Sequence, residues 1–90
     1  MSNADVLVLA VARYLCRRPL VDLHQLADDL MKERRVRDAI GLSHVPRADT
    51  AEWLKGLNAV VKAVVELIRH GLATYIKETY MVRWEGGECL

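Results

Sequence analysis

The most regular pattern in the chain is an apolar stripe over residues 50–70. Its large side chains recur at steps of four and three residues: Trp53, Leu57, Val60, Val64 and Leu67. Polar side chains fall together on the opposite side: Lys55, Asn58, Lys62, Glu66 and Arg69. This spacing is typical of an amphipathic helix. The segment therefore predicts a long helix, with Asp49 and Glu52 as a capping box at its start.

An earlier apolar segment predicts a first helix over residues 5–18. Positions 6–12 are apolar without interruption, and a helix that is apolar nearly all round lies in the core or is covered by a partner. Pro19 ends this helix, because proline disfavours helical geometry in the residue before it. Residues 1–4 resemble a cloning remnant and are expected to be disordered or tag-derived.

A second helix is predicted after a brief extended link at residues 20–21. Asp22 is expected to cap it, since Gln25 stands three residues later as a capping-box partner. Apolar residues at the helical spacing supply its buried stripe: Leu23, Leu26, Ala27 and Leu30. The helix either ends near Met31 or continues until Gly41 stops it, and a loop then leads to the long helix.

The pattern changes again within LIRHGLATYIKETYMVRW, residues 67–84. Gly71 is placed to end the long helix as a left-handed residue. Two short segments beyond it favour strands through their β-prone side chains: residues 72–76 and 80–84. They predict a small hairpin with its turn at residues 77–79, followed by a frayed tail at residues 85–90.

The fold class that follows is mainly α with a small C-terminal β-hairpin, in one domain of 90 residues. The composition suits a folded chain, since 52% of it is hydrophobic and 28% charged. The first apolar segment is too short to span a bilayer. Cys16 and Cys89 lie far apart with no secretory signal before them, so both are expected to be reduced thiols of a cytoplasmic protein.

Two segments resemble parts of the winged helix-turn-helix domain. PLVDLHQLADDL, residues 19–30, is similar to the family's short strand and the helix after it, and LIRHGLATYI, residues 67–76, is similar to the end of its recognition helix and the first wing strand. The resemblance implies that the helix at residues 50–70 enters the major groove of duplex DNA while the hairpin touches the neighbouring backbone. It also implies a small transcriptional regulator or a phage or plasmid accessory factor.

Basic residues supply the candidate DNA contacts. Because the net charge is only +1, any phosphate-binding site must be local. The candidates lie in the arginine-rich run, the loop after it, the long helix and the hairpin: Arg34, Arg35, Arg37, Arg47, Thr50, Lys55, Lys62, Lys77 and Arg83. The alternative is a solvated surface, on which Glu33 and Asp38 partly neutralise the arginines.

Other classes of function leave little trace in the sequence. It contains no phosphate-cradling glycine loop, nucleophile elbow or metal-ligand spacing, so no enzyme, cofactor or metal site is expected. The expected partners are duplex DNA and a second copy of the chain, since the first helix has apolar surface to spare. The alternative function, favoured by the low net charge, is a protein-interaction module or dimeric structural adaptor on the same scaffold.

Overall fold

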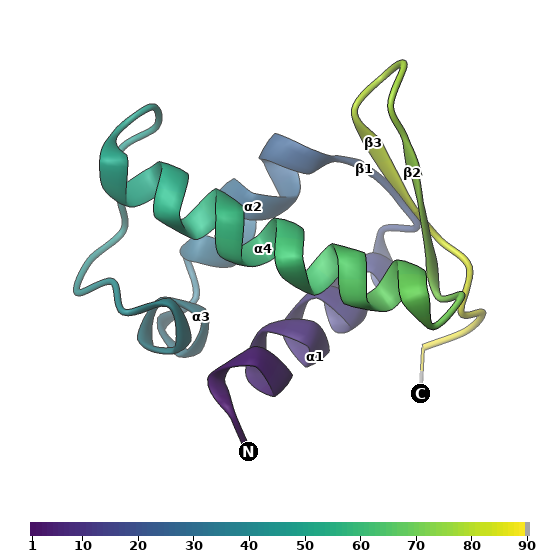
Figure 1. Ribbon diagram of the computed structural model, residues 1–90, viewed down its shortest axis with the longest axis horizontal. Coiled ribbons are helices and arrows are strands. Elements are labelled where there is room, and N and C mark those ends of the chain that lie inside the picture. Colours follow the sequence, from purple (N-terminus) through teal and green to yellow (C-terminus); the bar gives the residue numbers. More distant parts are fainter. Residues whose placement is uncertain (90) are drawn as a thin grey trace.

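The computed structural model describes residues 1–89, within which it has four helices and three strands (Figure 1). In chain order they are α1 (Asn3–Arg17), β1 (Leu20–Asp22), α2 (Leu23–Met31), α3 (Arg34–Ile40), α4 (Ala51–Arg69), β2 (Ala73–Ile76) and β3 (Met81–Trp84). The mainly helical class with a C-terminal hairpin is confirmed, and β1 adds a third strand to the hairpin. Every element contributes to a single core.

Helix α1 starts earlier than the sequence pattern suggested. The Ser2 hydroxyl accepts a hydrogen bond from the backbone N–H of Asp5 at 3.1 Å, so Ser2 is the N-cap and Asn3 is already helical. Asn3 and Ala4, which belong to the segment expected to be disordered or tag-derived, are therefore part of α1. One face of α1 is buried against the other helices through residues four apart: Leu7, Val11 and Leu15.

The start of α2 follows the prediction only in part. One carboxylate oxygen of Asp22 accepts hydrogen bonds from the backbone N–H of Gln25 and of the residue before it, at 3.1 and 2.9 Å. The Gln25 side chain does not complete the capping box, because it donates to Asp29 instead. The helix ends at Met31, so the shorter of the two alternatives is correct.

A separate short helix, α3, follows after a break at residues 32–33. The Arg37 side chain explains the break, since one guanidinium nitrogen donates to the carbonyl oxygens of Met31 and Lys32 at 3.0 and 2.7 Å. Carbonyls at the end of a helix lack intrahelical partners. Gly41 then ends α3 with a φ of 95°, in the left-handed region that glycine adopts without strain.

Helix α4 begins one residue later than expected. The hydroxyl of Thr50 accepts from the backbone N–H of Trp53 at 3.2 Å, so Thr50 is the N-cap in place of Asp49. The buried face then passes over Gly56, where an added Cβ would overlap the sulfur of Met31. The glycine in the middle of this helix is therefore explained by the close approach of α2.

Gly71 ends α4 as predicted. Its φ is 72°, its N–H donates to the carbonyl of Ile68 at 3.0 Å, and the N–H of Leu72 donates to the carbonyl of Leu67 at 2.9 Å. These two bonds satisfy carbonyls at the end of the helix. The chain then turns into β2, which confirms the change from helix to strand at this point.

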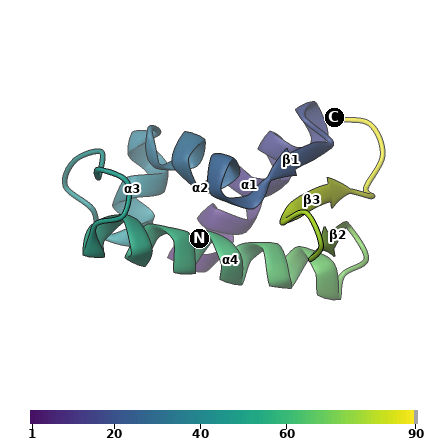
Figure 2. The ribbon, with the colours of Figure 1, turned by 90° about the horizontal axis from the view of Figure 1, so that it is seen from above.

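The hairpin closes through a turn without glycine. Tyr80 takes a positive φ of 57° at the end of that turn, and its carbonyl oxygen accepts from the N–H of Leu23 at 2.9 Å. Strand β3 lies in the centre of the sheet, with the order β1-β3-β2 and antiparallel pairing throughout. Val82 pairs with Val21 on one side and with Tyr75 on the other. The sheet covers one end of the helical body, beside the C-terminal end of α4 (Figure 2).

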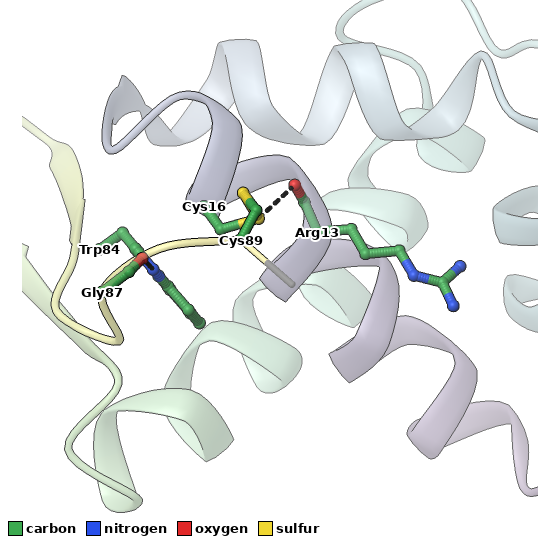
Figure 3. Close-up of a disulfide and its surroundings, with 5 residues drawn as sticks. All are labelled: Arg13, Cys16, Trp84, Gly87 and Cys89. Carbon is green, nitrogen blue, oxygen red and sulfur yellow. Dashed lines mark hydrogen bonds between the residues drawn. A yellow bond between two sulfur atoms is a disulfide. The ribbon is translucent and has the colours of Figure 1, made fainter.

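The two cysteines are joined by a disulfide, Cys16–Cys89, with a Cα–Cα distance of 5.3 Å (Figure 3). The expectation of two reduced thiols is therefore wrong. The cysteines no longer support the cytoplasmic location that was inferred from them. The tail is also held by the Trp84 indole, which donates to the carbonyl of Gly87 at 2.7 Å. The fraying expected after β3 is thus opposed by one covalent bond and one hydrogen bond.

The Met31–Gly56 contact predicts that the effect of Gly56→Ala on the free energy of unfolding changes sign when the Met31 side chain is removed. Gly56→Ala should lower the free energy of unfolding by about 1 kcal/mol, because overpacking at Met31 costs more than the helix propensity that alanine adds. In a Met31→Ala background the same substitution should raise it by about 0.5–1 kcal/mol, since the obstructing atoms are gone. Urea unfolding followed by circular dichroism measures both steps, and the same sign in both backgrounds would contradict the steric explanation.

The disulfide closes a loop with a sequence separation of 73 residues. Cys16→Ser/Cys89→Ser should therefore lower the free energy of unfolding by about 4 kcal/mol in the chain-entropy account. Reductant should bring the wild type to the same value and should leave the double variant unchanged. An unfolding midpoint that shifts equally in both proteins would show that reductant acts elsewhere.

Candidate nucleic-acid interface

The arginines of the predicted cluster do not form one patch, because their side chains have different partners. Arg34 is exposed and lies 3.9 Å from a carboxylate oxygen of Asp38. Arg37 is occupied with the carbonyls at the end of α2. Arg35 is exposed without an ion pair to another described residue, and Arg47 lies in the exposed part of the loop before α4. Only part of the cluster is therefore free to meet a ligand.

The predicted contacts on α4 and the hairpin are also dispersed. Thr50 uses its hydroxyl as the N-cap and also donates to the carbonyl of Arg47 at 2.7 Å. Lys55 and Lys62 are exposed on the edge of α4 that borders a groove shared with α1 and α3, and Lys77 is exposed in the hairpin turn. Arg83 in β3 forms an ion pair with Glu85, just beyond the end of the strand. Neither element concentrates positive charge.

Cations gather instead in a groove between α1, α2 and the start of α3, with a volume of about 730 Å³. We call it the cationic groove; its charged lining residues are Arg13, Arg17, Arg18, Asp29, Lys32, Glu33 and Arg35. Five cations against two carboxylates give the groove a formal charge of +3, whereas the whole chain carries +1. The remainder of the surface is therefore net negative.

The floor of the groove is built around Asp29, which joins α1 to α2. Its carboxylate accepts from the Tyr14 hydroxyl at 2.6 Å and from the Gln25 amide at 2.8 Å. Arg18 and Lys32 lie within 3.6 and 3.5 Å of the same carboxylate. Arg18 also lies 5.5 Å from the centre of the Tyr14 ring, in a cation–π contact. The negative charge of Asp29 is thus balanced by Arg18 and Lys32, which offset its repulsion of an incoming anion.

These contacts fix the protonation states at the floor. The hydrogen bond from Tyr14 is the largest of the causes that hold the pKa of Asp29 below its usual value; partial burial acts in the opposite direction, and Gln25 and Lys32 lower the pKa further. Burial raises the pKa of Tyr14, and the neighbouring Asp29 raises it further. At neutral pH the pair is therefore an ionised carboxylate and a protonated phenol, the combination that gives a short charge-assisted hydrogen bond.

Three arginines on the groove walls remain available to a ligand. Arg13 and Arg17 stand one helical turn apart on α1, and Arg35 stands opposite them in the first turn of α3. None of them forms an ion pair with another residue in the range 1–89. Figure 3 shows the guanidinium of Arg13 extending away from the disulfide that anchors the same stretch of α1. These side chains can therefore reach an anion without breaking an internal contact.

Sequence reasoning found one of the cationic lining residues, Arg35, and missed the rest. The missed signal was the spacing of Arg13 and Arg17 by four residues, which places both on one edge of the first helix. That spacing says nothing about which element lies opposite. Only the packing of α1 against α2 brings Lys32 and Arg35 across from it.

In comparisons with known proteins, the chain matches no family model, no curated protein and no solved structure. Within residues 1–89, no three histidine, cysteine or acidic side chains converge in a way that could hold a metal ion. No helix in that range combines the length and apolarity needed to cross a membrane.

The depressed pKa of Asp29 predicts how stability responds to acid. A carboxyl with a lowered folded pKa stabilises the fold above its unfolded value, near 3.8, and this contribution is lost as the pH falls through the folded value. Asp29→Asn should cost about 1–2 kcal/mol at pH 7 and flatten the loss of stability below about pH 4. Asp28→Asn is the matched control, because Asp28 is more exposed and an amide there still accepts from Trp53. Equal acid profiles for wild type and Asp29→Asn would contradict this assignment.

Proposed function

We propose that the protein binds duplex DNA by placing the phosphate backbone in the cationic groove. The observation that carries the proposal is the concentration of a +3 formal charge there in a chain of net charge +1. Neutralising phosphates with arginine and lysine releases counterions and supplies most of the affinity that does not depend on sequence. The net negative remainder of the surface favours approach of the duplex from the groove side alone.

Arginine is well suited to this contact. Its planar guanidinium offers several donors that match phosphate oxygens, and it stays charged at all physiological pH values. Arg13 and Arg17 are separated by about 6 Å along the axis of α1, since each helical residue rises about 1.5 Å. With Arg35 on the facing wall, the three guanidinium groups would bind the backbone from both sides.

The order of elements supports a winged-helix-like scaffold. Strand β1 follows α1, the long α4 runs into the β2–β3 hairpin, and the sheet order is β1-β3-β2. In this assignment α3 fills the long segment between α2 and the helix that corresponds to the recognition helix. We place the main phosphate contacts in the cationic groove, because the exposed lysines of α4 are fewer and share their edge of the helix with Glu66.

Docking of a protein is the second candidate function, and the exposed face of α4 favours it. Leu54, Val65 and Ile68 on this helix are 49, 40 and 38% exposed. Contiguous apolar surface of this kind marks interaction sites in folded proteins. It does not compete with the first proposal, because none of these residues lines the cationic groove.

Arg13→Ala/Arg17→Ala should weaken binding to a short random-sequence duplex by about tenfold or more, because two phosphate contacts are lost. The slope of log affinity against log salt, between about 50 and 200 mM, should become shallower by about 2. Fluorescence anisotropy of a labelled duplex measures both quantities.

The control removes the same number of charges from α4. Lys55→Ala/Lys62→Ala should leave the affinity and its salt slope close to those of the wild type. A larger effect of the α4 pair would place the contact on that helix, and equal effects would attribute binding to net charge alone. Either result would overturn the assignment to the cationic groove.

A further inference from the structure

The end of the chain folds back over the Trp84 indole as a short strap, which we define as residues 86–89. An added Cβ at its first residue, a glycine, would overlap ring atoms of Trp84, so the backbone of the strap lies directly against the indole. The indole N–H donates to the carbonyl of Gly87 at 2.7 Å, and Cys89 is bonded to Cys16 on α1 (Figure 3). The strap therefore covers Trp84 between two fixed points, the end of β3 and the end of α1.

The attachment of the chain to the body changes after Glu85. The N–H of Glu85 donates to the carbonyl of Leu72 at 2.8 Å, and its carboxylate pairs with Arg83, so this residue is tied to the sheet. Residues 86–89 have one hydrogen bond to the rest of the described chain, the bond from Trp84. Fixing four residues, two of them glycines, costs more conformational entropy than one hydrogen bond and a contact with the ring return in water. The disulfide is therefore what keeps the strap closed.

We propose that the strap is a redox-controlled cover, closed over Trp84 while the disulfide is intact and open once the disulfide is reduced. The body stays folded, because α1 and the sheet are also joined without the disulfide: the N–H of Trp84 donates to the carbonyl of Pro19 at 2.7 Å, and β1 pairs with β3. Opening frees the indole N–H and the part of the ring beneath the strap. The cover is independent of the proposed DNA binding, since neither cysteine nor Trp84 lines the cationic groove.

The disulfide is accessible to a reductant. Cys89 is exposed and Cys16 is half-buried, and thiol–disulfide exchange requires access to one sulfur. A thiolate of a dithiol reductant attacks the Sγ of Cys89, which forms a mixed disulfide and displaces Cys16 as a thiolate that takes a proton from water. The second thiolate of the reductant then displaces Cys89, which is protonated in turn. Two electrons thus pass to the protein, and the dithiol becomes a disulfide.

The structure also accommodates the Cys16 thiol that reduction produces. The Cys16 sulfur lies 3.2 Å from the carbonyl oxygen of Arg13 (Figure 3), and in the disulfide it has no proton to donate there. A thiol at the same position can donate a weak hydrogen bond to that oxygen. The two ends of the broken bond therefore differ, because Cys16 keeps its place in α1 whereas Cys89 leaves with the strap.

Solvent exchange of the two indole N–H groups tests the cover, because each tryptophan gives its own NMR signal. Reduction of the wild type with a dithiol should raise the exchange rate of the Trp84 N–H about tenfold or more, because its hydrogen bond to the strap is lost. The Trp53 N–H lies 3.4 Å from a carboxylate oxygen of Asp28 and should keep its rate, as an internal control. Cys16→Ser/Cys89→Ser should show the same fast exchange at Trp84 without reductant.

Two results would overturn the proposal. An unchanged exchange rate at Trp84 in fully reduced protein would show that the strap stays closed without the disulfide. Faster exchange at both indoles, or loss of the helical circular dichroism signal, would show that reduction unfolds the whole domain.

Gly86→Ala tests the contact between strap and ring. The added methyl group overlaps Trp84 in the closed strap and is free in the open one, so the equilibrium constant for reduction in glutathione buffers should rise by about tenfold. Glu88→Ala is the matched control, because Glu88 is exposed in the same strap. Alkylation of free thiols measures both constants. Equal constants for the two variants would contradict the packing of the strap on Trp84.

Discussion

The close approach of α2 to α4 at Gly56 is the constraint on which the rest of the arrangement depends. A Cβ at Gly56 would overlap the sulfur of Met31, the last residue of α2, so the Met31 side chain can lie against α4 here because α4 has no side chain at this position. Helix α2 ends at this contact, and Arg37 donates to the carbonyl oxygens of Met31 and Lys32. The break sets the position of α3, and with it the wall of the cationic groove that carries Arg35. The contact in the core and the charged wall of the groove thus meet at the same break in the chain.

The opposite wall is fixed by the sheet and by Asp29. Strand β3 hydrogen-bonds β1, its last residue donates to the carbonyl of Pro19 at 2.7 Å, and the carbonyl of Tyr80 accepts from the first residue of α2. These bonds hold the end of α1 and the start of α2 at a defined angle. Asp29 then joins the two helices through Tyr14 along the groove floor. The groove is therefore bounded by elements that the sheet joins at one end and that the Tyr14–Asp29 hydrogen bond joins along the floor.

The elements could be predicted from the sequence because their signals are local. Proline after α1, Asp22 before α2 and glycine after α4 each act on the backbone within a few residues. Where two adjacent residues both suit a cap, as Asp49 and Thr50 do, the pattern cannot choose between them. The site was harder to predict. The arginine-rich run looks like one patch in the sequence, but Arg37 turns back to the end of α2 and the helix directs the other arginine side chains elsewhere. The disulfide and the facing of α1 onto α3 join distant segments, so no local pattern contains them.

Low net charge is therefore a poor guide to what this surface can bind. The chain separates a positive groove beside α1 from the exposed apolar side chains Leu54, Val65 and Ile68 of α4, and the two surfaces use different residues. One groove of formal charge +3 would neutralise few phosphates, and its affinity alone would be modest at physiological salt.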